Sequence, residues 1–156
     1  MTDPMEALVS LQKAIKQGIV QLQSCDLYPD LQVIADRPAG KMRITYAKIE
    51  RYTVQAIAMF VLADPLEGIP CFQTGYAVIE SMRKSGLGTD ILAKGIAEMR
   101  NGFMRNGAKR FYVEAVVSVD NEPSNRIAKQ LLSNTPKAIT DEFCGEPALH
   151  YAKLVE

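Results

Sequence analysis

The chain has 156 residues, 47% hydrophobic and 23% charged, which is enough for one domain to bury a core without disulfide or metal support. Its 18 Lys and Arg residues balance 18 Asp and Glu residues, so the strongly basic composition typical of nucleic-acid binding is excluded. Three separated cysteines and a single histidine do not fit a zinc cluster, and reduced cytoplasmic thiols are expected, with no metal.

The sequence also lacks the features of export and membrane insertion. Its longest apolar run, residues 56–63, is far shorter than the roughly 20 residues that a membrane span requires. The first residues, MTDPME, are acidic where a secretory signal would be basic. We therefore expect a single cytoplasmic domain over residues 1–156, with neither a membrane nor a nucleic acid as partner.

The first expected element is an amphipathic helix that begins at Asp3 and Pro4 and ends before the break at Tyr28 and Pro29. Asp3 is a favourable N-cap, and proline suits the first helical position. Apolar residues recur at spacings of three and four along this segment: Met5, Leu8, Leu11, Ile15, Ile19 and Leu22.

A β-type pattern follows and predicts an antiparallel meander. The expected strands, separated by turns at 38–40 and 65–68, lie near 31–35, 42–50, 53–63 and 72–79. Residues 54–62 are almost all apolar, so this strand should be central and covered on both faces.

The second half of the chain alternates between helix and strand. A helical period runs from Leu87 to a stop at Asn106 and Gly107, and a strand over 110–120 places Glu114 and Ser118 on its more polar face. Asn121 can cap a short helix, and residues 138–155 are typical of two strands. The predicted order is helix, four strands, helix, strand, helix and two strands.

Residues 83–90, RKSGLGTD, connect a predicted strand to a predicted helix. Gly86 and Gly88 have no Cβ, so a ligand can approach the backbone, and N–H groups from Lys84 to Thr89 can bind an anion at the helix start. Positive charge and hydroxyl groups come from Arg83, Lys84, Ser85 and Thr89.

Other glycine motifs fit this segment less well. A P-loop would need GxxxxGK followed by Ser or Thr, which is absent. A dinucleotide-binding turn would need a third glycine, where Ile91 stands. A plain turn, in which the glycines serve only backbone geometry, remains an alternative.

R-x-x-G-x-G at 83–88, followed further along by a β run and N-x-x-S at 121–124, resembles the GNAT N-acetyltransferase superfamily. RKSGLGTDILAKGI is similar to its acyl-CoA pyrophosphate motif, and VSVDNEPSNRIAKQLL to the next strand and helix. The resemblance implies an α/β fold of the α+β type, with a mixed, mostly antiparallel sheet of about six to seven strands and helices on both faces. The N-x-x-S pattern is similar to the branch that acetylates ribosomal-protein N-termini.

The resemblance also implies a donor and an acceptor. Acetyl-CoA would be the donor, and the acceptor would be the amine of a small molecule or a protein N-terminus, attacking directly in a ternary complex. A homodimer is common in the family. The residues implied to bind the cofactor are Tyr76, Ala77 and Val78 for the pantetheine arm, Arg83, Lys84, Ser85, Gly86, Leu87, Gly88 and Thr89 for the pyrophosphate, and Asn121 and Ser124 from the far side. An N–H near Val78 would stabilise the developing oxyanion.

The catalytic positions depart from the family pattern. Acylation needs a neutral amine, so a base must remove a proton from the acceptor. The departing thiolate needs an acid that protonates it. The positions where many members carry glutamate and tyrosine are Val116 and Ala128 here. Glu114 is our candidate base, with a surface ion pair to lysine or arginine as the alternative, and Ser124 is the candidate acid or an ordinary first-turn residue.

Three further side chains and two further functions stay open. His150 is expected at an edge or in the core, and Tyr46 and Tyr52 either line an acceptor cleft or pack. The missing catalytic groups keep a non-catalytic acyl-CoA-binding module as the alternative to an acetyltransferase. An α/β interaction domain without a CoA site is a third possibility.

Overall fold

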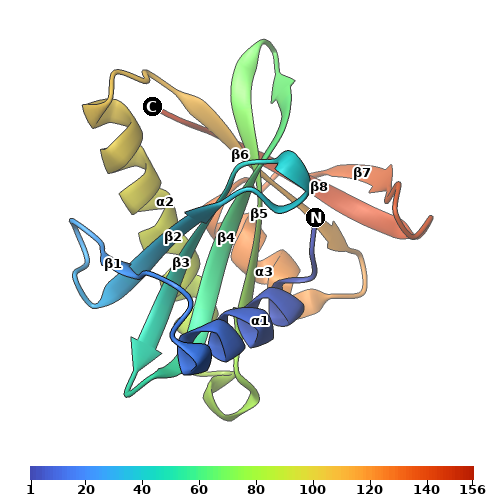
Figure 1. Cartoon of the computed structure of the whole chain (residues 1–156). Helices are drawn as coiled ribbons and strands as arrows, with labels where there is room; N and C mark the ends of the chain where they lie inside the picture. The colour runs from blue at the N-terminus through green and yellow to red at the C-terminus, as the bar shows by residue number, and fades with distance from the viewer.

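The computed structural model describes residues 1–156 as one eight-stranded sheet with three α-helices (Figure 1). The strands lie in the order β1-β2-β3-β4-β5-β6-β8-β7. Neighbouring strands are antiparallel, except that β5 and β6 are parallel, so the expected mixed and mostly antiparallel sheet is confirmed. The elements are α1 (Pro4–Gln17), β1 (Gln23–Ser24), β2 (Leu31–Asp36), β3 (Arg43–Glu50), β4 (Thr53–Leu66), β5 (Ile69–Val78), α2 (Leu87–Arg105), β6 (Phe111–Ser118), α3 (Glu122–Leu131), β7 (Lys137–Thr140) and β8 (Pro147–Val155).

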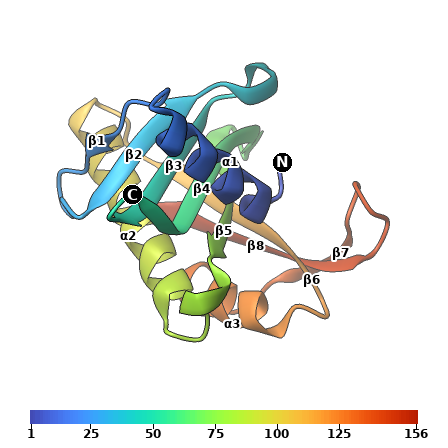
Figure 2. The same cartoon turned by 60° about the horizontal axis from the view of Figure 1, so that its bottom comes forward.

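Helices cover both faces of the sheet, as expected. Figure 2 shows α1 on one face and α2 and α3 on the other. The eighth strand, beyond the expected six to seven, is β1, which has only two residues and so carries no readable period. None of the helices combines the length and apolar character needed to cross a bilayer.

The predicted central strand is β4. Val54 and every residue from Ala56 to Phe60 are fully buried, because α1 covers one face of the strand and α2 the other. The core under α1 is small: Leu8, Ala47, Val54, Ile57 and Ala77. The larger core lies under α2 and α3 and includes Phe60, Ile91, Met99, Phe111 and Tyr151.

Helix α1 begins as predicted but ends well before Tyr28. The Asp3 carboxylate accepts the N–H groups of Met5 and Glu6 at 2.9 and 3.1 Å. The helix stops at Gly18, which adopts φ +68° and closes a left-handed C-cap. Ile19 therefore lies outside the helix and is 74% exposed, although it continues the apolar spacing.

Candidate functional site

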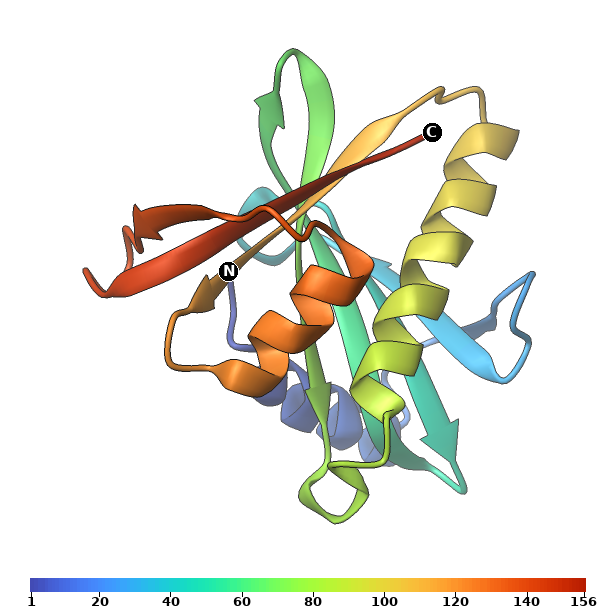
Figure 3. The ribbon, with the colours of Figure 1, turned by 180° about the vertical axis from the view of Figure 1, so that it is seen from behind.

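Strands β5 and β6 lie side by side for only three residue pairs and then diverge. The last pair joins Gln73 to Glu114, after which β5 stays with β4 and β6 stays with β8 (Figure 3). The remaining part of β5, up to Val78, therefore has a free edge inside the sheet.

The backbone groups on that free edge come from alternate residues. The N–H of Ile79 donates to the Gln55 carbonyl at 3.0 Å, so the antiparallel ladder directs the N–H and C=O of Ala77 to β4. The same alternation directs those of Tyr76 and Val78 into the gap. Of the three residues expected to pair with a ligand, two present their backbone groups and Ala77 does not.

The loop after β5 forms a cradle of free N–H groups. No backbone or side-chain acceptor in the chain binds the N–H groups of residues 84–89. Lys84 and Gly86 have φ values of +62° and +82°, and Gly86 is the N-cap of the 19-residue helix α2, without a side-chain cap. Unsatisfied N–H groups at the positive end of a helix form a site for an anion.

The two glycines in this loop are required for different reasons. A Cβ on Gly86 would contact nothing within 4 Å, so glycine serves the left-handed backbone there. A Cβ on Gly88 would lie 2.7 Å from Cε2 of Tyr76, so glycine there makes room for the tyrosine ring.

The other residues of the cradle differ in what they contribute. Leu87 is buried in the core, so only its backbone faces the loop. The Arg83 Nε donates to the Val78 carbonyl at 3.2 Å, and the Ser85 hydroxyl donates to the Met82 carbonyl. Lys84 is exposed and Thr89 is half-buried.

The N-terminus of α3 closes the far side of the gap. Asn121 caps this helix by accepting the Ser124 N–H at 3.2 Å, and the Ser124 hydroxyl lies 3.0 Å from that of Tyr76 on β5. Sequence reasoning missed Asn125, whose buried amide donates to the carbonyls of Ser118 and Asn121 and accepts the Tyr151 hydroxyl at 2.7 Å. The sequence signal that could have identified Asn125 is a polar residue on the inner face of an amphipathic helix.

The two positions that depart from the family pattern both carry apolar side chains. Ala128 is buried in the core under α3, and Val116 is half-buried on β6. Neither can exchange a proton.

Glu114 contacts a histidine rather than the lysine or arginine that the alternative interpretation required. Its Oε2 lies 2.8 Å from Nε2 of His150 on β8. His150 was expected at an edge or in the core, but β7 flanks β8 and the imidazole is 22% exposed. Burial, with a smaller contribution from the Glu114 carboxylate, raises the pKa of Cys71 on β5 to about 12, so this thiol stays protonated.

The two tyrosines proposed for an acceptor cleft lie elsewhere. Tyr46 is buried under α2 and contacts Phe60 edge to face, with ring centroids 5.9 Å apart. Tyr52 is 80% exposed in the turn between β3 and β4. No group of three or more metal-binding side chains occurs in the structure.

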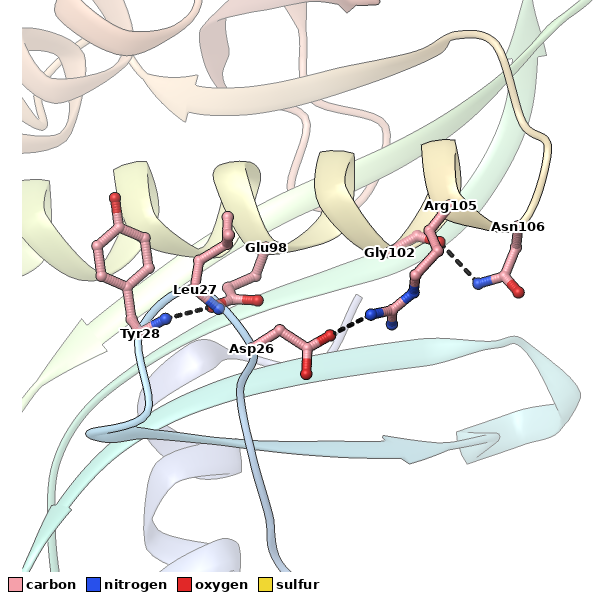
Figure 4. A network of polar contacts seen from close by, with 7 residues as sticks. All are labelled: Asp26, Leu27, Tyr28, Glu98, Gly102, Arg105 and Asn106. Carbon is pink, nitrogen blue, oxygen red and sulfur yellow. Dashed lines mark hydrogen bonds and ion pairs between the residues drawn. The ribbon is translucent and has the colours of Figure 1, made fainter.

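Helix α2 is fixed to the sheet through the loop before β2 (Figure 4). The buried carboxylate of Glu98 accepts the N–H groups of Leu27 and Tyr28, both at 2.7 Å. Arg105 forms an exposed ion pair with Asp26 at 2.6 Å. These contacts hold the helix whose first turn forms the cradle.

No protein-family model matches the chain, and no curated protein is similar to it in sequence. Solved structures with a similar fold include GNAT acetyltransferases. One, from Streptococcus pneumoniae, has a TM-score of 0.55 at 12% identity over 73% of this chain and 67% of its own. Another, from Salmonella typhimurium, modifies the N-terminal serine of a 50S ribosomal subunit protein and has a TM-score of 0.51 at 18% identity over 73% of this chain.

A third similar structure is a ribosomal α-N-protein acetyltransferase in complex with coenzyme A, with a TM-score of 0.51 and 19% identity over 72% of this chain. The matched region spans 64% of the Salmonella chain and 62% of the coenzyme A complex, less than two thirds of either. The chain thus has the GNAT acetyltransferase fold.

Proposed function

We propose that the protein is an N-acetyltransferase that transfers the acetyl group of acetyl-CoA to an amine. The observation that carries this proposal is that the free edge of β5 leads, through one short turn at 79–83, to the cradle at residues 84–89. A free strand edge followed by a group of unpaired N–H groups suits an extended amide-bearing arm that ends in a pyrophosphate.

The residues present fit such a donor. Backbone groups of Tyr76 would pair with the amides of the arm, while the Val78 carbonyl accepts the Arg83 Nε–H. The cradle N–H groups, with Lys84 and the other guanidinium N–H groups of Arg83, would hold the phosphates. The free N–H of Val78 would donate to the thioester oxygen as negative charge develops there. Asn121 holds Ser124 in place at the far side of the gap.

The acid and the base come from opposite faces of the sheet. Ser124, with the Tyr76 hydroxyl behind it, would give a proton to the departing sulfur. Glu114 and His150 lie at the point where the strands part and would remove a proton from the acceptor amine. The acceptor is the amine of a small molecule or of a protein N-terminus.

Calorimetric titration with acetyl-CoA tests the donor site. Wild type should show saturable binding, and Gly86→Glu should weaken it by about tenfold or more, because a carboxylate then faces the bound phosphates. Gly107→Glu is the matched control, since Gly107 also has positive φ and open space but lies at the opposite end of α2. Absence of binding by wild type, or equal weakening in both variants, would contradict the proposal.

A non-catalytic acyl-CoA-binding module is the second candidate, favoured by the apolar residues Val116 and Ala128. Thiol release from acetyl-CoA across a panel of amines, peptides and aminoglycosides separates the two. Thiol release that is lost in Gly86→Glu supports the enzyme. Acetyl-CoA binding without thiol release in the presence of any acceptor supports the module.

A further inference from the structure

Glu114 and His150 form a side-chain hydrogen bond at the place where the sheet separates. Glu114 belongs to the last residue pair between β5 and β6, so its side chain lies at the vertex of the gap. The two side chains are 16% and 22% exposed, and their atoms Oε2 and Nε2 are 2.8 Å apart. They are therefore neither buried in the core nor freely solvated.

The pair lies on the sheet face opposite α2 and α3. Val113 and Ala115 point into the core under those helices, so Glu114 and Val116 point the other way. On β5, Gly75 shares that face, because a Cβ there would lie 2.8 Å from Pro4 at the start of α1. The cradle residue Gly88, by contrast, contacts Tyr76 on the α2 side. A donor held by the cradle and the Glu114–His150 pair would thus approach the gap between β5 and β6 from opposite faces of the sheet.

His150 lies directly beside Val116 in the ladder between β6 and β8. Paired residues of antiparallel strands project from the same face, so the imidazole lies next to the position that the resemblance gives to a catalytic glutamate. The histidine on the neighbouring strand therefore brings an ionisable group to the place where β6 itself has only a valine.

The contact between the two side chains determines which ring nitrogen is free. Nε2 lies 2.8 Å from the carboxylate oxygen, which can only accept a hydrogen bond when ionised. In the neutral ring, the hydrogen therefore belongs on Nε2 and Nδ1 is the nitrogen free to accept a proton. No other group in the chain forms a hydrogen bond with the ring. A carboxylate that fixes one imidazole nitrogen so that the other can accept a proton is a recurrent catalytic arrangement.

Few other titratable groups face this pair. Cys71 on β5 stays protonated, and Tyr112, on the same face of β6, donates its hydroxyl to Glu67 at 3.0 Å. Lys137 on β7 pairs with His150 in the ladder and is exposed. Its positive charge opposes that of a protonated ring, so Glu114 is the counter-charge that an imidazolium needs.

We infer that His150 is the base of the proposed transfer and that Glu114 is the positioning residue that fixes its tautomer. Nδ1 takes one proton from the acceptor ammonium, and the imidazolium that forms is stabilised by the Glu114 carboxylate. The neutral amine then forms the C–N bond as the C–S bond breaks. The second amine proton reaches the departing sulfur through Ser124, and His150 returns its proton to solvent.

This inference rests on the proposed function, but its first test does not need turnover. His150 is the only histidine, so the ring nitrogens of ¹⁵N-labelled protein give one set of long-range NMR correlations. Wild type should show the Nε2–H tautomer, and Glu114→Ala should show a mixture of both tautomers. Glu146→Ala, which removes an exposed carboxylate elsewhere on the chain, should leave the wild-type tautomer. An unchanged tautomer in Glu114→Ala would overturn the positioning role.

The second test measures thiol release with an amine that wild type acetylates in the panel. His150→Ala should lower the rate about a hundredfold with acetyl-CoA affinity unchanged, and added imidazole should restore part of it. If wild type releases thiol and His150→Ala releases it at the same rate, this inference alone is overturned. Absence of release by wild type with any acceptor overturns both the catalytic role and the proposed enzyme.

Discussion

The hydroxyl of Tyr76 on β5 lies 3.0 Å from the hydroxyl of Ser124 on α3, and this contact crosses the gap between β5 and β6. The tyrosine ring reaches Ser124 by lying over Gly88, in the first turn of α2. One side chain therefore links the free strand edge, the cradle and the helix on the far side.

Gly88→Ala should destabilise the protein by about 1–3 kcal/mol, because the added methyl group would displace the Tyr76 ring. Gly102→Ala in the same helix is the control, since its Cβ would contact nothing within 4 Å. That variant should gain about 0.5–1 kcal/mol from helix propensity. Urea unfolding measures both free energies, and equal changes in the two variants would argue against the steric role of Gly88.

If Ser124 is the proposed acid, Ser124→Ala should lower the rate of thiol release by about tenfold or more, because the departing sulfur then lacks this proton donor. Acetyl-CoA affinity should change little, since the cradle is intact. Tyr76→Phe should give a smaller loss, as it removes only the second hydroxyl. Calorimetry and a thiol assay measure the two quantities, and an equal loss of affinity and rate would place Ser124 in binding instead.

Glu98→Ala should cost about 2–4 kcal/mol in the free energy of unfolding. It leaves the N–H groups of Leu27 and Tyr28 without their acceptor and removes a side chain that is only 6% exposed. Arg105→Ala breaks only the exposed pair with Asp26 and should cost less than about 1 kcal/mol. Denaturant unfolding of both variants tests the difference, and similar costs would contradict it.

Stability should fall as the pH rises above about 9 because of two buried thiols. Burial is the main reason that the pKa of Cys25 and of Cys71 is raised to about 12 in the folded protein, compared with 9.0 for an ordinary thiol. The unfolded chain therefore loses these protons first, and each thiol can remove up to about 1.4 kcal/mol of stability per pH unit above 9. Below that pH both states hold the protons and the contribution is constant.

Urea unfolding at about pH 8 and about pH 10 measures this effect. Cys71→Ala should flatten the fall in stability between the two pH values, whereas Cys144→Ala, at an exposed position, should follow wild type. The same fall in Cys71→Ala as in wild type would exclude this thiol as a cause.

Local patterns predicted the parts of the fold that depend on neighbouring residues. The apolar run at 54–62 indicated the buried central strand β4, and Asp3 with Pro4 indicated the start of α1. The glycines at 86 and 88 indicated the cradle, because positive φ and close backbone approach depend on the absence of a Cβ at those residues. The end of α1 was also encoded locally, in Gly18, but the apolar spacing beyond it concealed the stop.

Contacts between distant residues depended on the tertiary structure. Glu114 was a candidate base from its unusual place in an apolar strand, but its partner His150, 36 residues away, follows from the register between β6 and β8. Tyr76 and Ser124, 48 residues apart, meet only because β5 and α3 border the same gap. The sequence by itself determined which side chains are available and how each short segment folds. The tertiary structure decided which of these side chains meet, because burial of one whole face of each strand sets the pairing register.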